Sequence, residues 1–344
     1  MMVDFSNLES AEVWLDGQSV ETRQLISSRA ALRVLANICP TPSELEDRLA
    51  LTCLRATLTS AGRGAGRPAD ADWDSAANSA ARSAAYSAAN STAISAANSA
   101  ANSAASSAAR SAANSDSNAA PPLSTTLATI AVWGDVDVPV DTLDNHNSFL
   151  TFLAADPKWA FWHGWYTAMW NGTFEDWGLA FEVIKIADDV WEGDDAAQKV
   201  ADEIARIKAR LKLKAEIASL KEKLQTYEAI PTAGHNQGPP LNDITERRKT
   251  IELVWPLVEE LDEEIEKPSP DLAKLQALFA KLSEISLAVV KYCASKADKS
   301  VDVMVETGTK AILAVGAGEF VGINEGIASI VKALAQFLKA SAGG

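Results

Sequence analysis

Apolar residues recur at near-helical spacing along most of the chain. Between residues 20 and 38 they mark one face of a helix, which Pro40 ends. A capping box begins at Thr41 and favours a second helix to about Thr59, before several glycines break the chain. The N-terminal part of the sequence therefore predicts a pair of helices.

A tetrapeptide repeat follows from Ser75 to Ser115, with serine at every fourth position and two alanines after nearly every serine. Alanine and asparagine are poor strand formers, so a strand is not expected. In a helix, four residues turn about 400°, so the serine row drifts around the axis and leaves no fixed apolar face. Two alternatives stay open: a helix of roughly 60 Å that another backbone approaches closely, or a low-complexity spacer.

Tryptophan is concentrated in the next part of the chain, where seven of the ten lie between residues 133 and 191. Residues 121–150 are rich in proline, threonine and aspartate and predict irregular chain. Asp156 before a proline marks a helix start, and a second helix is expected near Thr173. One face of the first helix carries aromatic side chains that we expect to be structural core and not a ligand cage: Trp159, Trp162, Tyr166 and Trp170.

Residues 196–230 predict one long helix with two apolar registers that are out of step. Each register lasts only about two heptads, whereas a coiled coil needs about three or four. Packing within the subunit is therefore at least as well supported as a coiled-coil dimer. A linker rich in proline and glycine follows, and beyond it a helical hairpin is expected, with Ser269 as the N-cap of its second arm.

The C-terminal tail carries a doubled G-x-x-x-G pattern, which lets helices pack backbone to backbone in membranes. A glycine costs a helix in water about 1 kcal/mol relative to alanine, so three of them in one helix need a reason. The predicted membrane or oligomer interface comprises Gly318, Phe320, Gly322, Ile323, Gly326, Ile327 and Ile330. The glycines would face neighbouring tails, while the large apolar residues, Leu334 included, would meet lipid.

Two glutamates oppose a membrane span of this tail. Glu319 and Glu325 would each cost roughly 2–3.5 kcal/mol at the middle of a bilayer. They could instead line a polar interior between helices of an oligomer. The alternative is a soluble helix that docks on the preceding hairpin and uses glycine for close packing.

These segments predict a mostly α protein with little or no sheet. Its parts are an N-terminal helical domain with the repeat, an acidic tryptophan-rich helical unit, a long charged helix, a linker, and a C-terminal hairpin with a glycine-zipper tail. Their expected boundaries are 1–120, 121–195, 196–230, 231–243 and 244–344.

The formal net charge of −15 argues against a general nucleic-acid binder, and we expect none as a partner. Residues 121–195 hold 2 basic and 13 acidic residues, whereas residues 196–230 hold 8 basic and 5 acidic ones. Attraction between these two blocks is expected. No signal peptide opens the chain, and no charge-free stretch of about 18 apolar residues occurs. We therefore expect a cytoplasmic protein, peripheral to or inserted in the inner membrane if the tail acts there.

No motif for catalysis or metal binding emerges. His146, His163 and His235 lack metal-ligand spacing, and three scattered cysteines predict neither a disulfide framework nor a zinc site. The aspartates between Asp135 and Asp144 fail the EF-hand pattern and indicate a solvated acidic loop. We expect no cofactor, no metal and no catalytic residue, and hence a protein that is not an enzyme.

Several motifs together resemble a family of uncharacterised bacterial helical proteins. They are the repeat after an N-terminal helical pair, the Trp159-x2-Trp162-x2-Trp165-Tyr166 block with its Gly172 turn and Trp191-x-Gly193, and the GHNxGPP linker at residues 234–240. The resemblance covers most of residues 15–240 and leaves out the C-terminal hairpin and tail. It implies a helical fold and no known activity.

Two functional hypotheses follow. The first is a non-enzymatic protein that assembles with copies of itself and acts on a membrane through its C-terminal segment, for example as an effector in conflict or defence. The second is a soluble scaffold or protein-interaction module without membrane activity. Association with liposomes separates the two.

Overall fold

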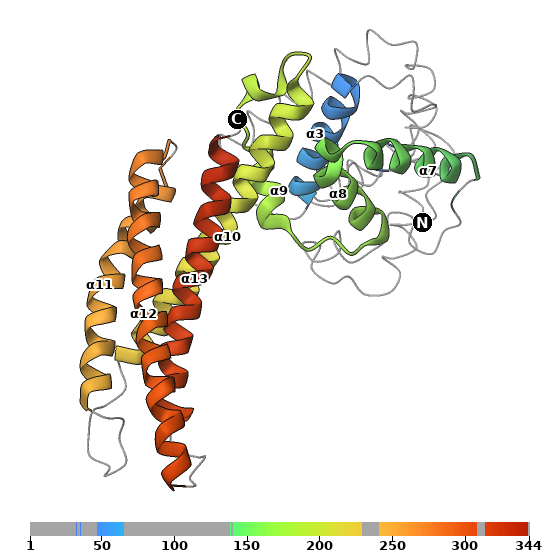
Figure 1. The fold of residues 1–344 in the computed structure, drawn as a ribbon. Coiled ribbons are helices and arrows are strands. Elements are labelled where there is room, and N and C mark those ends of the chain that lie inside the picture. Colours follow the sequence, from blue (N-terminus) through green and yellow to red (C-terminus); the bar gives the residue numbers. More distant parts are fainter. Residues whose placement is uncertain are drawn as a thin grey trace, which may run out of the picture. The chain divides into compact units, whose positions relative to one another are not determined.

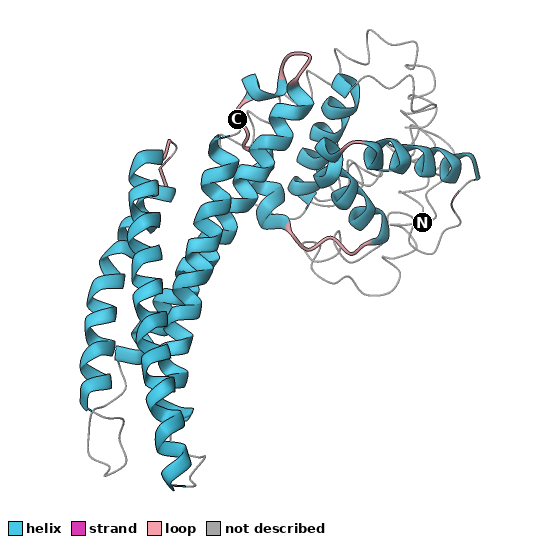
Figure 2. Cartoon of the chain, in the orientation of Figure 1, coloured by secondary structure: helices cyan, strands magenta, loops and turns pink. Residues whose placement is uncertain are grey.

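The computed structural model describes residues 32, 35, 47–64, 138, 140–228, 241–267, 269–307 and 314–342. Over these residues the chain is helical and contains no strand (Figure 2). The all-helical fold class predicted from the sequence is confirmed for this part. The predictions for the Ser75–Ser115 repeat, for the Thr41 capping box and for His235 lie outside the described residues.

The chain forms two compact units, Met1–Ile204 and Ala205–Gly344. In the first unit, α7 lies beside α8, and α3 lies beside α9 (Figure 1). Its elements are α3 (Asp47–Gly64), α7 (Val140–Ala155), η3 (Pro157–Trp159), α8 (Ala160–Asn171), α9 (Trp177–Ile184) and η4 (Asp188–Trp191).

Helix α3 continues past Thr59, where the sequence predicted its end, to Gly64. The reason is packing: Leu54, Leu58 and Ala61 are fully buried on one side of the helix. Burial of this stripe outweighs the unfavourable helix propensity of the glycines near its end.

Helix α7 corrects the prediction of irregular chain over residues 121–150. It begins at Val140 and buries one face in steps of four, three and four residues. That face consists of Thr142, His146, Phe149 and Leu153. Because two of the four are polar, the helical period is hard to recognise from the sequence. The aspartates of the predicted acidic loop from position 141 onward lie within this helix.

The signals around α8 act as the sequence indicated, with one exception. The Asp156 carboxylate accepts a hydrogen bond from the backbone N–H of Lys158 (3.0 Å), and Gly172 ends α8 with a left-handed φ of 69°. Thr173 does not start the next helix, because its N–H bonds back to the Ala168 carbonyl (2.8 Å). Asp176 caps α9 instead.

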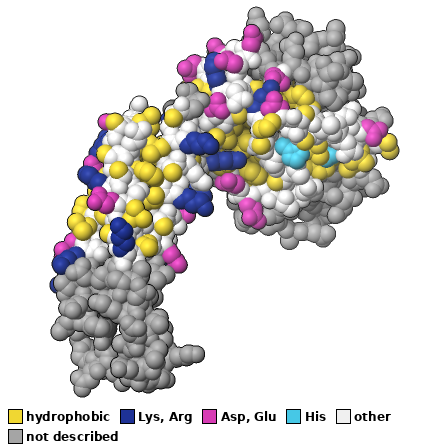
Figure 3. All heavy atoms as spheres, viewed as in Figure 1, with side chains coloured by type: hydrophobic (Ala, Val, Ile, Leu, Met, Phe, Trp, Pro, Cys, Tyr) yellow, Lys and Arg dark blue, Asp and Glu magenta, His cyan; other side chains and the backbone are white. Residues whose placement is uncertain are grey.

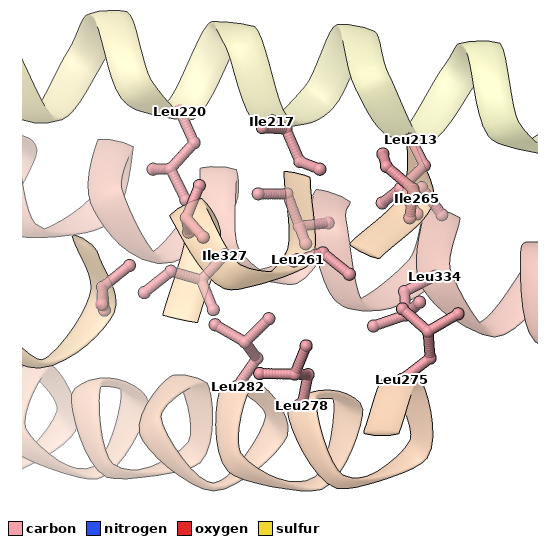
Figure 4. Close-up of a cluster of buried hydrophobic side chains, with 14 of the residues drawn as sticks. Leu213, Ile217, Leu220, Leu261, Ile265, Leu275, Leu278, Leu282, Ile327 and Leu334 are labelled. Atoms are coloured by element: carbon pink, nitrogen blue, oxygen red, sulfur yellow. The ribbon is translucent and has the colours of Figure 1, made fainter. Parts of the chain in front are cut away.

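In the second unit, side chains from four helices share one core (Figure 4). The helices are α10 (Ala196–Glu228), of which residues 205–228 belong to this unit, α11 (Leu241–Ile265), α12 (Leu272–Thr307) and α13 (Ala314–Ala342). We call this arrangement the α10–α13 bundle. Helix α11 begins inside the segment predicted as linker, so the last residues of that segment are helical.

The first register of α10 begins in the first unit, and the second register lies in the second. Val200 and Ile204 are buried in the first unit, whereas Leu213, Ile217 and Leu220 lie in the core of the bundle. The change of register in the sequence therefore falls close to the point where the chain passes from one unit to the next.

The turn between α11 and α12 is closed by two carboxylates. Asp271 caps α12, accepting hydrogen bonds from the backbone N–H groups of Ala273 (2.9 Å) and Lys274 (3.1 Å). The prediction of Ser269 as N-cap is therefore wrong by two positions. The fully buried Glu264 side chain accepts from the Asp271 N–H (2.9 Å) and from the Lys267 ammonium (2.7 Å).

Candidate functional site

Three of the four aromatic residues predicted as structural core are enclosed in the first unit. Trp159, Trp162 and Tyr166 are each at most 1% exposed, and Trp165 is equally buried. The Trp162 and Trp165 rings meet edge to face, with centroids 5.9 Å apart. Aromatic rings packed in this way contribute beyond their buried area. Trp170 is only half-buried.

His146 joins this aromatic cluster from α7. Its ring stacks on Trp170 with centroids 3.8 Å apart, and its Nδ1 lies 3.1 Å from the Tyr166 hydroxyl. Burial lowers the pKa of His146 and raises that of Tyr166 well above its usual range. Both groups are therefore neutral at pH 7, which suits a hydrogen bond between two buried polar side chains. The sequence did not single out this pairing.

Arg55 is the second feature that sequence reasoning missed. Its side chain is 4% exposed, donates to the Asp188 carboxylate at 2.5 Å and lies with its Cζ 4.4 Å from the centre of the Trp191 ring. This guanidinium links α3 to η4, because it is both ion-paired and stacked on an aromatic ring. No sequence signal pairs residues 133 positions apart.

Lys158 makes a similar link between α3 and the start of η3. Its ammonium contacts the Asp47 carboxylate at 2.6 Å and the Asp156 carboxylate at 3.3 Å. The hydrogen bond to Asp47 is the main cause of the raised pKa of Lys158. Together with Arg55, this lysine ties parts of the first unit that are far apart in the sequence.

None of these groups is arranged as an activated nucleophile. Burial raises the pKa of the Cys53 thiol to about 11, so this cysteine is protonated at neutral pH. Among the residues that the structure describes, no group of three or more histidine, cysteine or acidic side chains is placed to hold a metal ion. The contacts described above for the first unit are those of packing and internal pairing.

The predicted interface of the tail lies in α13, within the α10–α13 bundle. Ile323, Ile327 and Ile330 are fully buried, and Leu334 joins them in the core. These four side chains, which were expected to meet lipid, are enclosed by α10, α11 and α12, because they also fit the core of the bundle. Gly318 and Phe320 belong to α13 but lie outside the residues whose side chains are described.

The glycines of α13 have an identifiable packing role at one position. Gly326 is buried, and a Cβ atom added there would lie 2.8 Å from Cδ1 of Leu220 on α10. That separation is shorter than van der Waals contact, so the absence of a side chain lets α13 approach α10 closely. Gly322 is half-buried, and Glu325 is exposed.

Two basic side chains of α10 pair with carboxylates that lie beyond the acidic block at residues 121–195. Lys221 contacts the Asp262 carboxylate of α11 at 2.5 Å, and Lys214 pairs with Glu266, the first residue after α11. The sequence predicted attraction to the acidic block at residues 121–195. From that block, the structure pairs Asp195 with Lys199 at 2.8 Å, one turn away along the chain.

Comparison with known proteins identifies no relative of this chain. No family model matches it, and neither the curated proteins nor the solved structures contain a match. No helix in the described part of the chain combines the length and apolar character that crossing a membrane requires.

Proposed function

We propose that the protein is a non-enzymatic helical scaffold or interaction module whose α10–α13 bundle is an assembling part. The observation that carries this proposal is the burial of the apolar face of α13 inside its own bundle. A tail that already fills a core has its apolar side chains occupied. The residues left for other molecules are those on the outer surfaces of the helices.

The energy of releasing α13 supports the same proposal. Five large apolar side chains of α13 lie in the core: Ile323, Ile327, Ile330, Leu334 and Phe337. Exposing each costs about 1.5–3 kcal/mol, so freeing the helix into water would cost about 8–15 kcal/mol. This is the size of the whole folding free energy of a typical domain. Membrane insertion would therefore need a trigger that opens the bundle.

Membrane action is the competing proposal, and it rests on the glycine spacing of the tail. It corresponds to a self-assembling effector in conflict or defence. Its requirement is that the face of α13 containing Ile327 leaves α10 and meets lipid.

Flotation with liposomes containing anionic lipid tests the proposal. We expect the wild-type protein to stay in the aqueous fraction and to release no entrapped dye. Two variants of α13 sharpen the test: Ile327→Asp, at a buried position, and Gln336→Asp, at an exposed one. A scaffold predicts that only Ile327→Asp lowers the melting temperature.

The opposite result would support the membrane function. In that case the wild-type protein floats with the liposomes, and Ile327→Asp abolishes flotation while the protein in solution stays as stable as the Gln336→Asp control.

A further inference from the structure

Helix α12 carries a second uncharged stripe beside its core side, of which Phe279 is half-buried and packs on the core while other members are exposed. The core side of the helix contains Leu275, Leu282 and Val289, all buried. On another side, Leu287 is 61% exposed, Val290 47% and Leu272 37%. In steps of three and four residues this stripe runs through Leu272, Gln276, Phe279, Ser283, Leu287 and Val290. We call these residues the α12 stripe.

The same spacing continues along the sequence of α12. Ala294, Ala297, Val301 and Met304 follow at steps of four, three, four and three, and none is charged. A stripe of this period kept over about four heptads is typical of a helix that packs against another helix. The core of the bundle takes Phe279 from this stripe but leaves Leu287 and Val290 exposed, so these are available for another contact.

The neighbouring helix α13 adds a row of small side chains beside the α12 stripe. Ala328, Ala335 and Ala342 are all exposed and lie seven residues apart. A hydrogen bond between Ser286 Oγ and Asn324 Oδ1 (3.1 Å) joins the two helices on this side. Hydrophobic atoms gather on the surface over α12 and α13 (Figure 3). The face therefore consists of a bulky stripe next to a row of methyl groups.

Such a face is complementary to itself. In a two-fold dimer with its axis along the helices, the bulky stripe of each copy lies on the alanine row of the other. No charge has to be removed from water in the centre, which avoids the main cost of burying a surface. Exposed residues of both signs flank the face, with Glu284 and Lys291 on α12 and Glu325 and Lys332 on α13.

The dimensions are adequate for a stable dimer. The 29 residues of α13 correspond to about 43 Å of helix, and two adjacent helices are about 20 Å wide. The product, about 860 Å² on each copy, is close to the roughly 800 Å² that each partner buries in an interface of standard size.

From these observations we infer that the α12 stripe and the alanine row of α13 form a two-fold interface with a second copy of this chain. The inference rests on the proposed scaffold function and names its partner and its surface. The partner surface is the α12–α13 pair of the second copy, and the large side chains of each α12 stripe pack against the alanine row of the other copy.

Sedimentation velocity of the full chain over a concentration series tests the inference. We expect a reversible monomer–dimer equilibrium that sodium sulfate strengthens, because excluded salts favour apolar burial. Leu287→Glu should raise the dissociation constant at least about tenfold, since it places a charge at the centre of an apolar interface. Val290→Glu should act in the same direction.

Leu253→Glu is the matched control. Leu253 is also 61% exposed but lies on α11, outside the proposed face, so this substitution should leave the dimer unchanged. Circular dichroism of each variant should match that of the wild type, because these side chains lie at the surface.

Three outcomes would overturn the inference. A wild-type protein that is monomeric at every concentration and does not float with liposomes refutes the dimer but leaves the scaffold function standing. A dimer that Leu287→Glu and Leu253→Glu weaken equally, or not at all, refutes this face as the interface. A monomer that floats with liposomes and loses flotation through Leu287→Glu assigns the face to lipid and refutes the scaffold function as well.

Discussion

Replacing Gly326 with alanine tests the close packing of α13 on α10. The added Cβ would lie 2.8 Å from Cδ1 of Leu220, and 3.7 Å from both Cβ and Cγ of the same residue. Carbon atoms pack favourably at about 3.5–4.0 Å, so the first of these contacts is too short. Leu220 is fully buried, and its side chain must therefore shift against a filled core.

The magnitude follows from two opposing contributions. Alanine favours a helix over glycine by about 1 kcal/mol. Overpacking a filled core costs about 1–3 kcal/mol. The net effect of Gly326→Ala on the free energy of unfolding should lie between no change and a loss of about 2 kcal/mol. Gly326→Leu adds more volume at the same contact and should destabilise the protein further.

Gly164→Ala supplies the control. Gly164 is an exposed position within α8, where an added Cβ meets nothing within 4 Å. The gain in helix propensity is therefore not opposed by overpacking. Gly164→Ala should be more stable than wild type by about 0.5–1 kcal/mol. Gly326→Ala and Gly164→Ala should thus differ by about 1–3 kcal/mol.

The assay is urea unfolding followed by circular dichroism, extended to a double-mutant cycle. Leu220→Ala alone should cost about 2–5 kcal/mol. Combined with Gly326→Ala it should cost less than the sum of the two, with a coupling of about 0.5–3 kcal/mol, since the colliding atom is gone. The reasoning is refuted if Gly326→Ala stabilises the protein as much as Gly164→Ala does and the cycle is additive.

The remaining predictions concern single side chains. Trp162→Ala should lower the free energy of unfolding by about 3–5 kcal/mol, and Trp177→Ala, at a half-buried position, by clearly less in the same urea titration. Burial lowers the pKa of His146 below 6.5, so the unfolded state binds more protons than the folded state as the pH drops below 6.5. The free energy of unfolding should therefore fall over that range. His146→Gln should make it depend less on pH. Hydrogen bonds from the Asp271 N–H and nearby lysines lower the pKa of Glu264 from 4.5 to about 2. The contribution of Glu264 to the free energy of unfolding should therefore be lost as the pH falls through that interval. Glu264→Gln should remove this acid sensitivity, whereas Glu263→Gln, at an exposed position, should not.

The sequence predicted those parts of the fold whose signals are local. Asp156 and Gly172 mark a helix start and end by short-range hydrogen bonding, and both act as expected. The long helix at residues 196–230 follows from its period and corresponds closely to α10. Thr173 and Ser269 were misjudged because a residue that favours an N-cap can also lie in a turn, and the neighbouring backbone decides between the two.

Tertiary pairing was beyond the sequence. The attachment of Arg55 to Asp188 and Trp191 joins distant segments, and α7 is hidden by polar residues such as His146 on its buried face. The tail is ambiguous for a physical reason. A stripe of isoleucines beside glycines suits a membrane dimer and the core of a bundle equally, since both require close approach of helices.

Hydrogen exchange of the α13 amides measures most directly whether the tail belongs to the bundle. Peptides covering Ile323–Phe337 would be followed by mass spectrometry, with and without liposomes containing anionic lipid. The account predicts strong protection in buffer alone, comparable to that of the core segment of α10 around Leu220, and no change on adding liposomes. Fast exchange of α13 in buffer, with protection appearing only when liposomes are present, would contradict it.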